Sequence, residues 1–147
     1  MSIYRKLEIY DPNQEASLER DRLVYLTSIA KQKRVLHVGC TDWPITRERL
    51  QSGNMLHHRL VGVAEQVVGI DLSSDGIDIL RASGVEDVHV MDAERMDFED
   101  EFDVVMAGDV LEHLNNPGLF IDRAKAALRP GGELVIAVPS ALTFANV

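Results

Sequence analysis

Residues 35–40 read VLHVGC and residues 67–71 read VVGID, and these two stretches decide the fold class. Each is a short apolar run, which is typical of a strand that is buried on both faces of a sheet. Gly39 follows the first run and Asp71 ends the second, 32 positions further along the chain. That distance leaves room for the crossover connection that parallel strands require. The two stretches therefore predict neighbouring strands of a parallel sheet.

Three more apolar runs continue this pattern. Together the candidate strands lie at residues 35–38, 67–70, 88–90, 102–106 and 134–138. Helical patterns separate them, most clearly at residues 117–128, where Asn116 can cap the helix and Pro117 suits its first position. An amphipathic helix is predicted over residues 13–31. The sequence therefore predicts an α/β fold with a doubly wound, mainly parallel sheet of about five strands.

The composition is that of an ordinary globular domain. A chain of 147 residues suits a single hydrophobic core, so residues 1–147 are expected to form one domain with its core at 34–140. The net charge of −9 argues against a nucleic acid partner, because the chain would repel phosphates. No apolar run is long enough to span a membrane, and the first residues do not resemble a signal peptide. The expected location is the cytoplasm, with no membrane partner.

Polar residues follow the strands at the sheet edge where ligands bind in such folds. Asp71 could accept both hydroxyls of a ribose, or it could cap the following helix. Asp92 could accept from an adenine amino group, or it could serve only as a turn residue. His113 is the first candidate for a general base and Asp109 the second, although His113 could also merely cap or pack a helix.

No metal site is predicted. Cys40 is the only cysteine, so it cannot supply a cysteine cluster. His57 and His58 are adjacent, and adjacent positions on a helix point about 100° apart. Both histidines are therefore expected to be solvated or to cap a helix.

The ordered set of motifs resembles that of the class I S-adenosylmethionine-dependent methyltransferases, a family with a Rossmann-like core. The motifs are VLHVGC, VGID, DA, FDVV followed by VLEHL, and LRPGGEL, and they extend over roughly residues 34–140. LEHL followed by LRPGG is similar to enzymes that act on small molecules. The resemblance implies S-adenosyl-L-methionine as cofactor. It also implies that the cofactor-binding residues are His37, Gly39, Cys40, Thr41, Asp71, Leu72, Asp92, Ala93, Gly108 and Asp109.

The first motif departs from the family, which usually has a carboxylate where His37 stands and further glycines where Thr41 and Trp43 stand. Its continuation, VLHVGCTD, and the stretch LHHRL resemble a bacterial subgroup associated with sugar or surface-polysaccharide biosynthesis. The expected acceptor is therefore a small molecule, such as a sugar or a polysaccharide precursor.

Two alternatives to this activity remain. One is a cofactor-binding or interaction module, derived from a methyltransferase, with little or no catalysis. The other is an NAD-dependent oxidoreductase, which is less favoured because CTDW places bulk and negative charge where a pyrophosphate would need a glycine-rich turn.

Members of the family normally continue after the fifth strand with a helix and an antiparallel hairpin. Only residues 139–147 follow here, so the sheet is expected to lack that hairpin. The fifth run, LVIAV, contains neither proline nor lysine and would form an apolar edge. We therefore expect a homo-oligomer that forms through the fifth-strand side.

Overall fold

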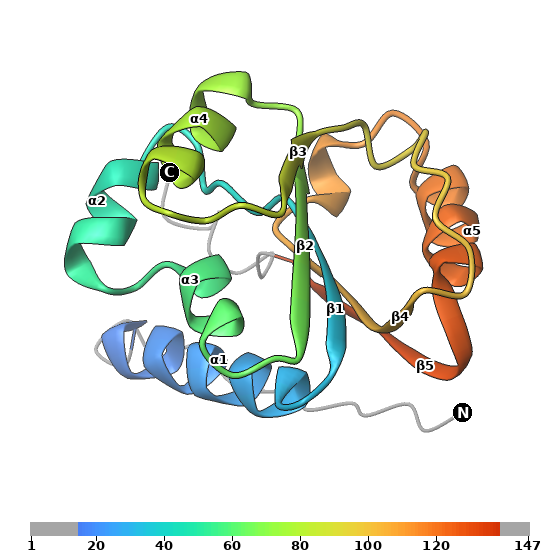
Figure 1. Ribbon diagram of the computed structural model, residues 1–147, viewed down its shortest axis with the longest axis horizontal. Coiled ribbons are helices and arrows are strands. Elements are labelled where there is room, and N and C mark those ends of the chain that lie inside the picture. The colour runs from blue at the N-terminus through green and yellow to red at the C-terminus, as the bar shows by residue number, and fades with distance from the viewer. Residues whose placement is uncertain (1–14, 139–147) are drawn as a thin grey trace.

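The computed structural model describes residues 15–138 and shows one five-stranded sheet with helices on both faces (Figure 1). The strands are β1 (Arg34–Val38), β2 (Gln66–Asp71), β3 (Val88–Val90), β4 (Phe102–Gly108) and β5 (Leu128–Ala137). Their order across the sheet is β3-β2-β1-β4-β5, and all four neighbouring pairs are parallel. The strand order therefore switches between β1 and β4, since β2 and β3 extend the sheet on one side of β1, and β4 and β5 extend it on the other. The predicted doubly wound sheet is confirmed.

The helices are α1 (Glu15–Ala30), α2 (Thr46–Ser52), α3 (Leu56–Val61), α4 (Ser74–Ala82) and α5 (Pro117–Ala127), with a short 3-10 helix η2 (Leu111–His113). The helices predicted at residues 13–31 and 117–128 correspond to α1 and α5. Asn116 caps α5 by accepting a hydrogen bond from the backbone N–H of Leu119 at 3.1 Å, as predicted. None of the helices within residues 15–138 has both the length and the apolar character of a membrane-crossing segment.

Two hydrophobic layers hold the sheet between its helices. On one face, Leu26 of α1 and Leu60 of α3 pack with Val104 of β4. On the other face, Phe120 and Ala124 of α5 pack with buried side chains of β1, β2 and β4. Figure 1 shows α1 and α3 on one side of the sheet and α5 on the other. The apolar runs were readable from the sequence because both faces of the central strands are covered.

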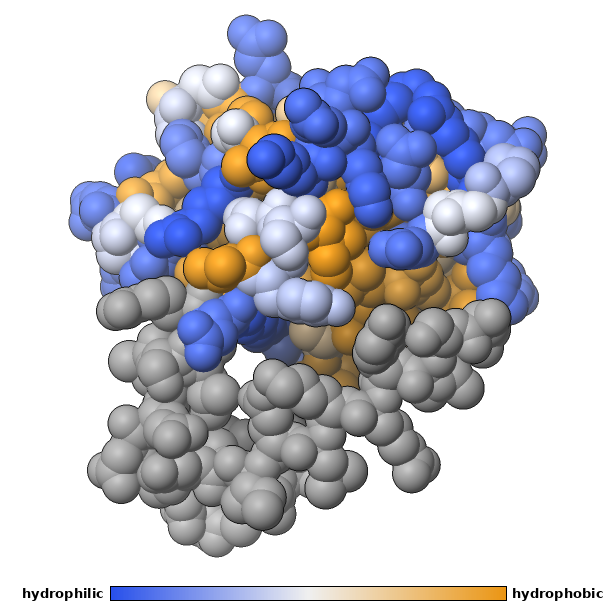
Figure 2. Space-filling view, turned by 90° about the horizontal axis from the view of Figure 1, so that it is seen from below, coloured by the Kyte–Doolittle hydropathy of each residue, from blue (hydrophilic) through white to orange (hydrophobic). Residues whose placement is uncertain are grey.

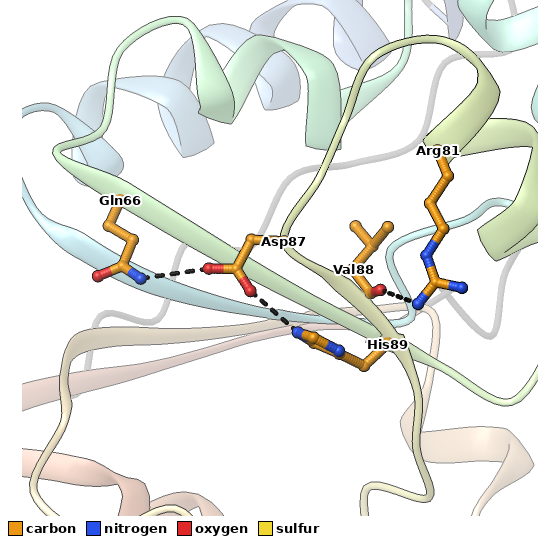
Figure 3. Close-up of polar contacts among 5 residues, drawn as sticks. All are labelled: Gln66, Arg81, Asp87, Val88 and His89. Carbon is orange, nitrogen blue, oxygen red and sulfur yellow. Dashed lines mark hydrogen bonds and ion pairs between the residues drawn. The ribbon is translucent and has the colours of Figure 1, made fainter.

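The outer side of β3 is protected by polar contacts. Gly69 of β2 donates to the carbonyl of Asp87, so the carbonyl of Val88 points toward the free edge, where Arg81 of α4 donates to it at 2.8 Å. Asp87 also accepts from Gln66 at 3.2 Å and lies 2.9 Å from the ring of His89 (Figure 3). A short strand with an occupied edge is a poor template for pairing with another chain.

The opposite edge strand, β5, is less well covered. None of its ten residues is buried, whereas β1 and β4 each contain four or more buried residues. The strand begins earlier than the predicted residue 134, because Leu128 already pairs with Phe102. An irregularity then separates this pair from the next, Val104 with Glu133, and Gly131 in this segment has φ +83°. The strand therefore includes a proline and two glycines, and its pairing with β4 is irregular at this point.

On the face that is seen from below in Figure 1, hydrophobic residues gather near the middle, and hydrophilic residues lie above them in the view of Figure 2. At β5, the side chain of Ile136 remains 37% exposed. The self-association expected through this strand stays a prediction.

Ile136→Lys tests that prediction, because a lysine on an edge strand opposes pairing with another chain. We expect light scattering on the 147-residue chain to show a dimer for the wild type and a monomer for this variant. Val24→Lys on the exposed surface of α1 is the matched control and should leave the dimer intact. A wild-type chain that is monomeric at all concentrations would contradict the expectation.

Candidate functional site

A pocket of about 560 Å³ lies at the carboxyl ends of the central strands, beside the point where the strand order reverses. Ligands of open α/β sheets bind at this position, and the volume lies within the range of small-molecule sites. Eight of the residues predicted for cofactor binding or catalysis line it, namely Gly39, Thr41, Asp71, Leu72, Ala93, Gly108, Asp109 and His113. The topology therefore brings together residues from four separate motifs.

Gly39 forms the sharp turn after β1. It has φ +74°, and its N–H donates to the carbonyl of Ile70 at 2.9 Å. A Cβ atom at this position would lie 2.5 Å from Cγ2 of Val110. Both the left-handed backbone and this close approach require glycine.

Asp71, at the end of β2, holds its carboxylate at the pocket through three donors. The N–H and the hydroxyl of Thr41 donate to Oδ2 at 3.1 and 2.8 Å, and the N–H of Ser73 donates to Oδ1 at 2.9 Å. An ionised carboxylate offers about four lone-pair positions, so Oδ1 keeps capacity for a further donor. Ser73, and not Asp71, is the cap of α4, because its side chain accepts from the N–H of Gly76 at 3.0 Å. The capping alternative for Asp71 was therefore wrong.

Asp92 makes local contacts after β3. Its Oδ1 accepts from the N–H of Glu94 at 2.9 Å, and its Oδ2 lies 3.6 Å from Nε of Arg95. Met91 and Ala93 line the pocket, but Asp92 does not. The turn alternative describes this residue, and the structure gives no support to its carboxylate as an adenine ligand.

Cys40 was predicted to bind the cofactor, but its side chain points into the core. It is fully buried and packs in a cluster with Met55 and Ile77. Burial raises the pKa of its thiol, so the group stays protonated at neutral pH. Only the backbone of Cys40 follows the turn at the pocket, so the side chain is corrected to a structural role.

His37 does not line this pocket either, and its ring stacks on that of His57. The ring centroids are 5.3 Å apart and the two Nδ1 atoms are 3.1 Å apart. His57 is fully buried, so the expectation that it is solvated or capping was wrong, whereas His58 is exposed as expected. Gly69 leaves the space, because a Cβ atom there would lie 2.6 Å from Cε1 of His57.

Burial lowers the pKa of both stacked imidazoles. The pKa of His37 lies well below its ordinary value, with the positive charges of His57 and Arg22 as further causes. The pKa of His57 is lowered to about 4 by burial and by the neighbouring His58. The pair is therefore neutral at physiological pH. Among residues 21–138 no group of three or more potential ligand side chains could hold a metal ion.

Asp109, the second candidate for a general base, forms an ion pair with α1. Its Oδ2 lies 3.1 Å from both terminal nitrogens of Arg22, a residue 87 positions away. Gly108 makes room for this contact, because a Cβ atom there would lie 2.8 Å from Nη2 of Arg22. His113, on η2, is exposed and lines the pocket. The ion pair makes Asp109 the weaker candidate for a base.

One wall of the pocket was not predicted from the sequence. Trp43, Pro44 and Ile45 line it from the loop after β1, and Trp43 is 48% exposed. The available signal in the sequence was a tryptophan a few residues after a predicted strand. The contact of Arg22 with Asp109 could not be predicted, because no sequence pattern links α1 with the end of β4.

Residues 50–136 match the family described as methyltransferase domain. Ubiquinone biosynthesis O-methyltransferase of Nitrobacter winogradskyi is 30% identical over 106 residues, which cover 69% of this chain and 36% of that protein. The chain thus spans little more than a third of this curated relative.

Solved structures give the same assignment of the fold. A candidate methyltransferase from Bacillus halodurans C-125 has a TM-score of 0.64 at 25% identity, covering 84% of this chain and 55% of that one. The cyclase SpnF has a TM-score of 0.58 at 26% identity, covering 84% of this chain and 44% of the cyclase. The motifs, the sheet and the family match agree, and this chain belongs to the class I methyltransferases.

Proposed function

We propose that this chain binds S-adenosylmethionine in the pocket at the strand ends and transfers its methyl group to a small-molecule acceptor. The observation that carries the proposal is the carboxylate of Asp71, held at the pocket by three donors with acceptor capacity left on Oδ1. A ribose hydroxyl is a donor that this oxygen can accept. The bound sulfonium supplies a methyl group on a good leaving group, so the protein contributes chiefly alignment and electrostatics.

The other lining residues fit the remaining parts of this cofactor. Leu72, Met91 and Ala93 offer apolar surface to the adenine ring beside Asp71. Gly39 and Gly108 line the pocket with backbone atoms and can face the methionine part. Within this proposal the whole chain is one cofactor-binding domain.

For the acceptor, we propose an oxygen nucleophile. The relative from Nitrobacter winogradskyi is named an O-methyltransferase, and His113 lines the pocket, where an imidazole could take a proton from a hydroxyl group. A sugar or polysaccharide precursor stays the predicted class, and a phenolic quinone precursor is the competing one. A methyl-transfer screen over both classes distinguishes them.

The alternative is a binding module without methyl transfer. The similarity to the cyclase SpnF supports this alternative, because that protein has a similar fold and is named for a different reaction. Cofactor binding without turnover on any acceptor would support this alternative.

Asp71→Ala is expected to weaken binding of S-adenosylmethionine and of its demethylated product by about 10- to 100-fold, the usual effect of losing hydrogen bonds to a charged group. Trp43 is the only tryptophan of the chain and lines the pocket, so its fluorescence should report the titration. Asp75→Ala, an exposed change in the first turn of α4, is the control and should bind like the wild type. Equal affinity of wild type and Asp71→Ala would remove the ribose assignment, and a response to NAD alone would favour an oxidoreductase.

A further inference from the structure

Thr41 is a fully buried polar residue that stands beside the pocket in contact with Asp71. Its hydroxyl donates to Oδ2 of Asp71 at 2.8 Å and accepts from the N–H of Trp43 at 3.3 Å. Its own N–H donates to the same Oδ2 at 3.1 Å. A threonine hydroxyl has a single proton, so this network commits it to one carboxylate oxygen.

The side chain of Thr41 is also fixed from the opposite side. A Cβ atom at Gly76, in the first turn of α4, would lie 2.5 Å from Cβ and 2.6 Å from Oγ1 of Thr41. The helix therefore packs directly on the threonine, and the absence of a side chain at Gly76 makes this possible. Packing of this kind locks the rotamer that aims the hydroxyl at Asp71.

The two carboxylate oxygens of Asp71 therefore have different hydrogen-bond partners. Oδ2 receives both donors of Thr41, whereas the one donor to Oδ1 within residues 15–138 is the N–H of Ser73. A free aspartate could rotate and present either oxygen to a ligand, and ordering it on binding would cost conformational entropy. In this protein the hydrogen bonds from Thr41 and Ser73 already hold the carboxylate of Asp71 in one orientation.

We propose that Thr41 is a positioning residue that fixes the carboxylate of Asp71 so that Oδ1 faces the ribose hydroxyls. The inference rests on the proposed function, because it concerns the same pocket and cofactor. It predicts that the hydroxyl of Thr41 sets both the affinity and the preference for a ligand with an intact ribose.

The test compares Thr41→Val, which keeps the shape and removes the hydroxyl, with Thr41→Ser, which keeps the hydroxyl. The probes are S-adenosylhomocysteine and its 2′-deoxy analogue, titrated by calorimetry and by the fluorescence of Trp43. Thr41→Val should bind S-adenosylhomocysteine about tenfold more weakly, the size of one hydrogen bond to a charged group. Its preference for the intact ribose over the 2′-deoxy analogue should shrink. Thr41→Ser should restore both values to within about twofold of the wild type.

Each outcome decides between the inference and the function on which it rests. A wild type that binds neither probe removes the proposed function, and the inference falls with it. A wild type that binds, together with a Thr41→Val variant of equal affinity and equal ribose preference, overturns the positioning role alone. Urea unfolding of each variant shows that it is folded. If Thr41→Val does not fold, Thr41→Ala takes its place, because it also removes the hydroxyl and adds no bulk against Gly76.

Discussion

Acidification from pH 7.5 to pH 5 should lower the free energy of unfolding by about 2 kcal/mol through His57, and its stacked partner His37 should add to this loss in the same direction. Both side chains are buried, with exposed fractions of 4% and 0%. Two neutral imidazoles can share one hydrogen bond between their Nδ1 atoms, 3.1 Å apart, but two imidazolium rings would both be donors and would repel. The folded protein therefore resists protonation of this pair.

The sign follows from the direction of the pKa shifts. Unfolded histidine has a pKa of about 6.5. In the folded protein, burial lowers the pKa of His57 to about 4 and also lowers that of His37. Between these values the unfolded chain binds more protons, so stability is complete above about pH 7 and is lost as the pH falls. Each imidazole contributes a slope of up to about 1.4 kcal/mol per pH unit.

The charged and titratable groups that act on the pair lie on several elements. Arg22 of α1 opposes a positive charge on His37, and His58 of α3 opposes one on His57. Asp87, before β3, acts in the other direction on His57. Since burial is the largest cause for both rings, the direction of the shift does not depend on these neighbours.

Urea unfolding at a series of pH values measures this effect. The variant His57→Asn should have a clearly smaller pH slope than the wild type, because one of the two buried imidazoles is gone. The exposed His113→Asn is the control for the loss of a histidine outside the buried pair. Identical slopes for the wild type and His57→Asn would show that the pair takes up protons in the folded state as readily as in the unfolded one.

The sheet could be predicted because its signals are local. The central strands are covered on both faces and read as continuous apolar runs, and the cap and proline of α5 mark the beginning of that helix. The start of β5 could not be predicted, because residues 128–132 contain proline and glycine and enter the sheet only through an irregular pairing with β4. Pairing between distant segments overrides the local preference there.

The positions of the site residues along the backbone could be predicted better than the directions of their side chains. A motif fixes where a strand ends, so Gly39 and Asp71 lie at the pocket, but successive side chains point in different directions. Cys40 turns into the core for this reason. The ion pair of Arg22 with Asp109, and the fit of Thr41 on Gly76, join segments that no single stretch of sequence connects.

The replacement Gly69→Ala should destabilise the fold by about 3 kcal/mol, the upper part of the usual range for overpacking a core. Gly69 lies in the middle of β2, paired with His37 of β1. A Cβ atom there would lie 2.6 Å from Cε1 of His57, 2.9 Å from Sγ of Cys40 and 2.9 Å from Cγ1 of Val88. These three neighbours come from separate elements and are all buried, so no single movement relieves the contact.

The matched control for this prediction is Gly62→Ala, at the end of α3. Gly62 has φ −74°, and the nearest atom to an added Cβ would be the carbonyl oxygen of Arg59 at 3.5 Å. Alanine fits that conformation, so this change should be neutral or should stabilise by about 0.5 kcal/mol through the unfolded state. In thermal unfolding, Gly69→Ala should lower the midpoint by about 6 to 12 °C, whereas Gly62→Ala should leave it unchanged or raise it slightly. If both variants melted together with the wild type, His57 could not be packed against Gly69, because alanine fits at position 69 only if the histidine ring lies elsewhere.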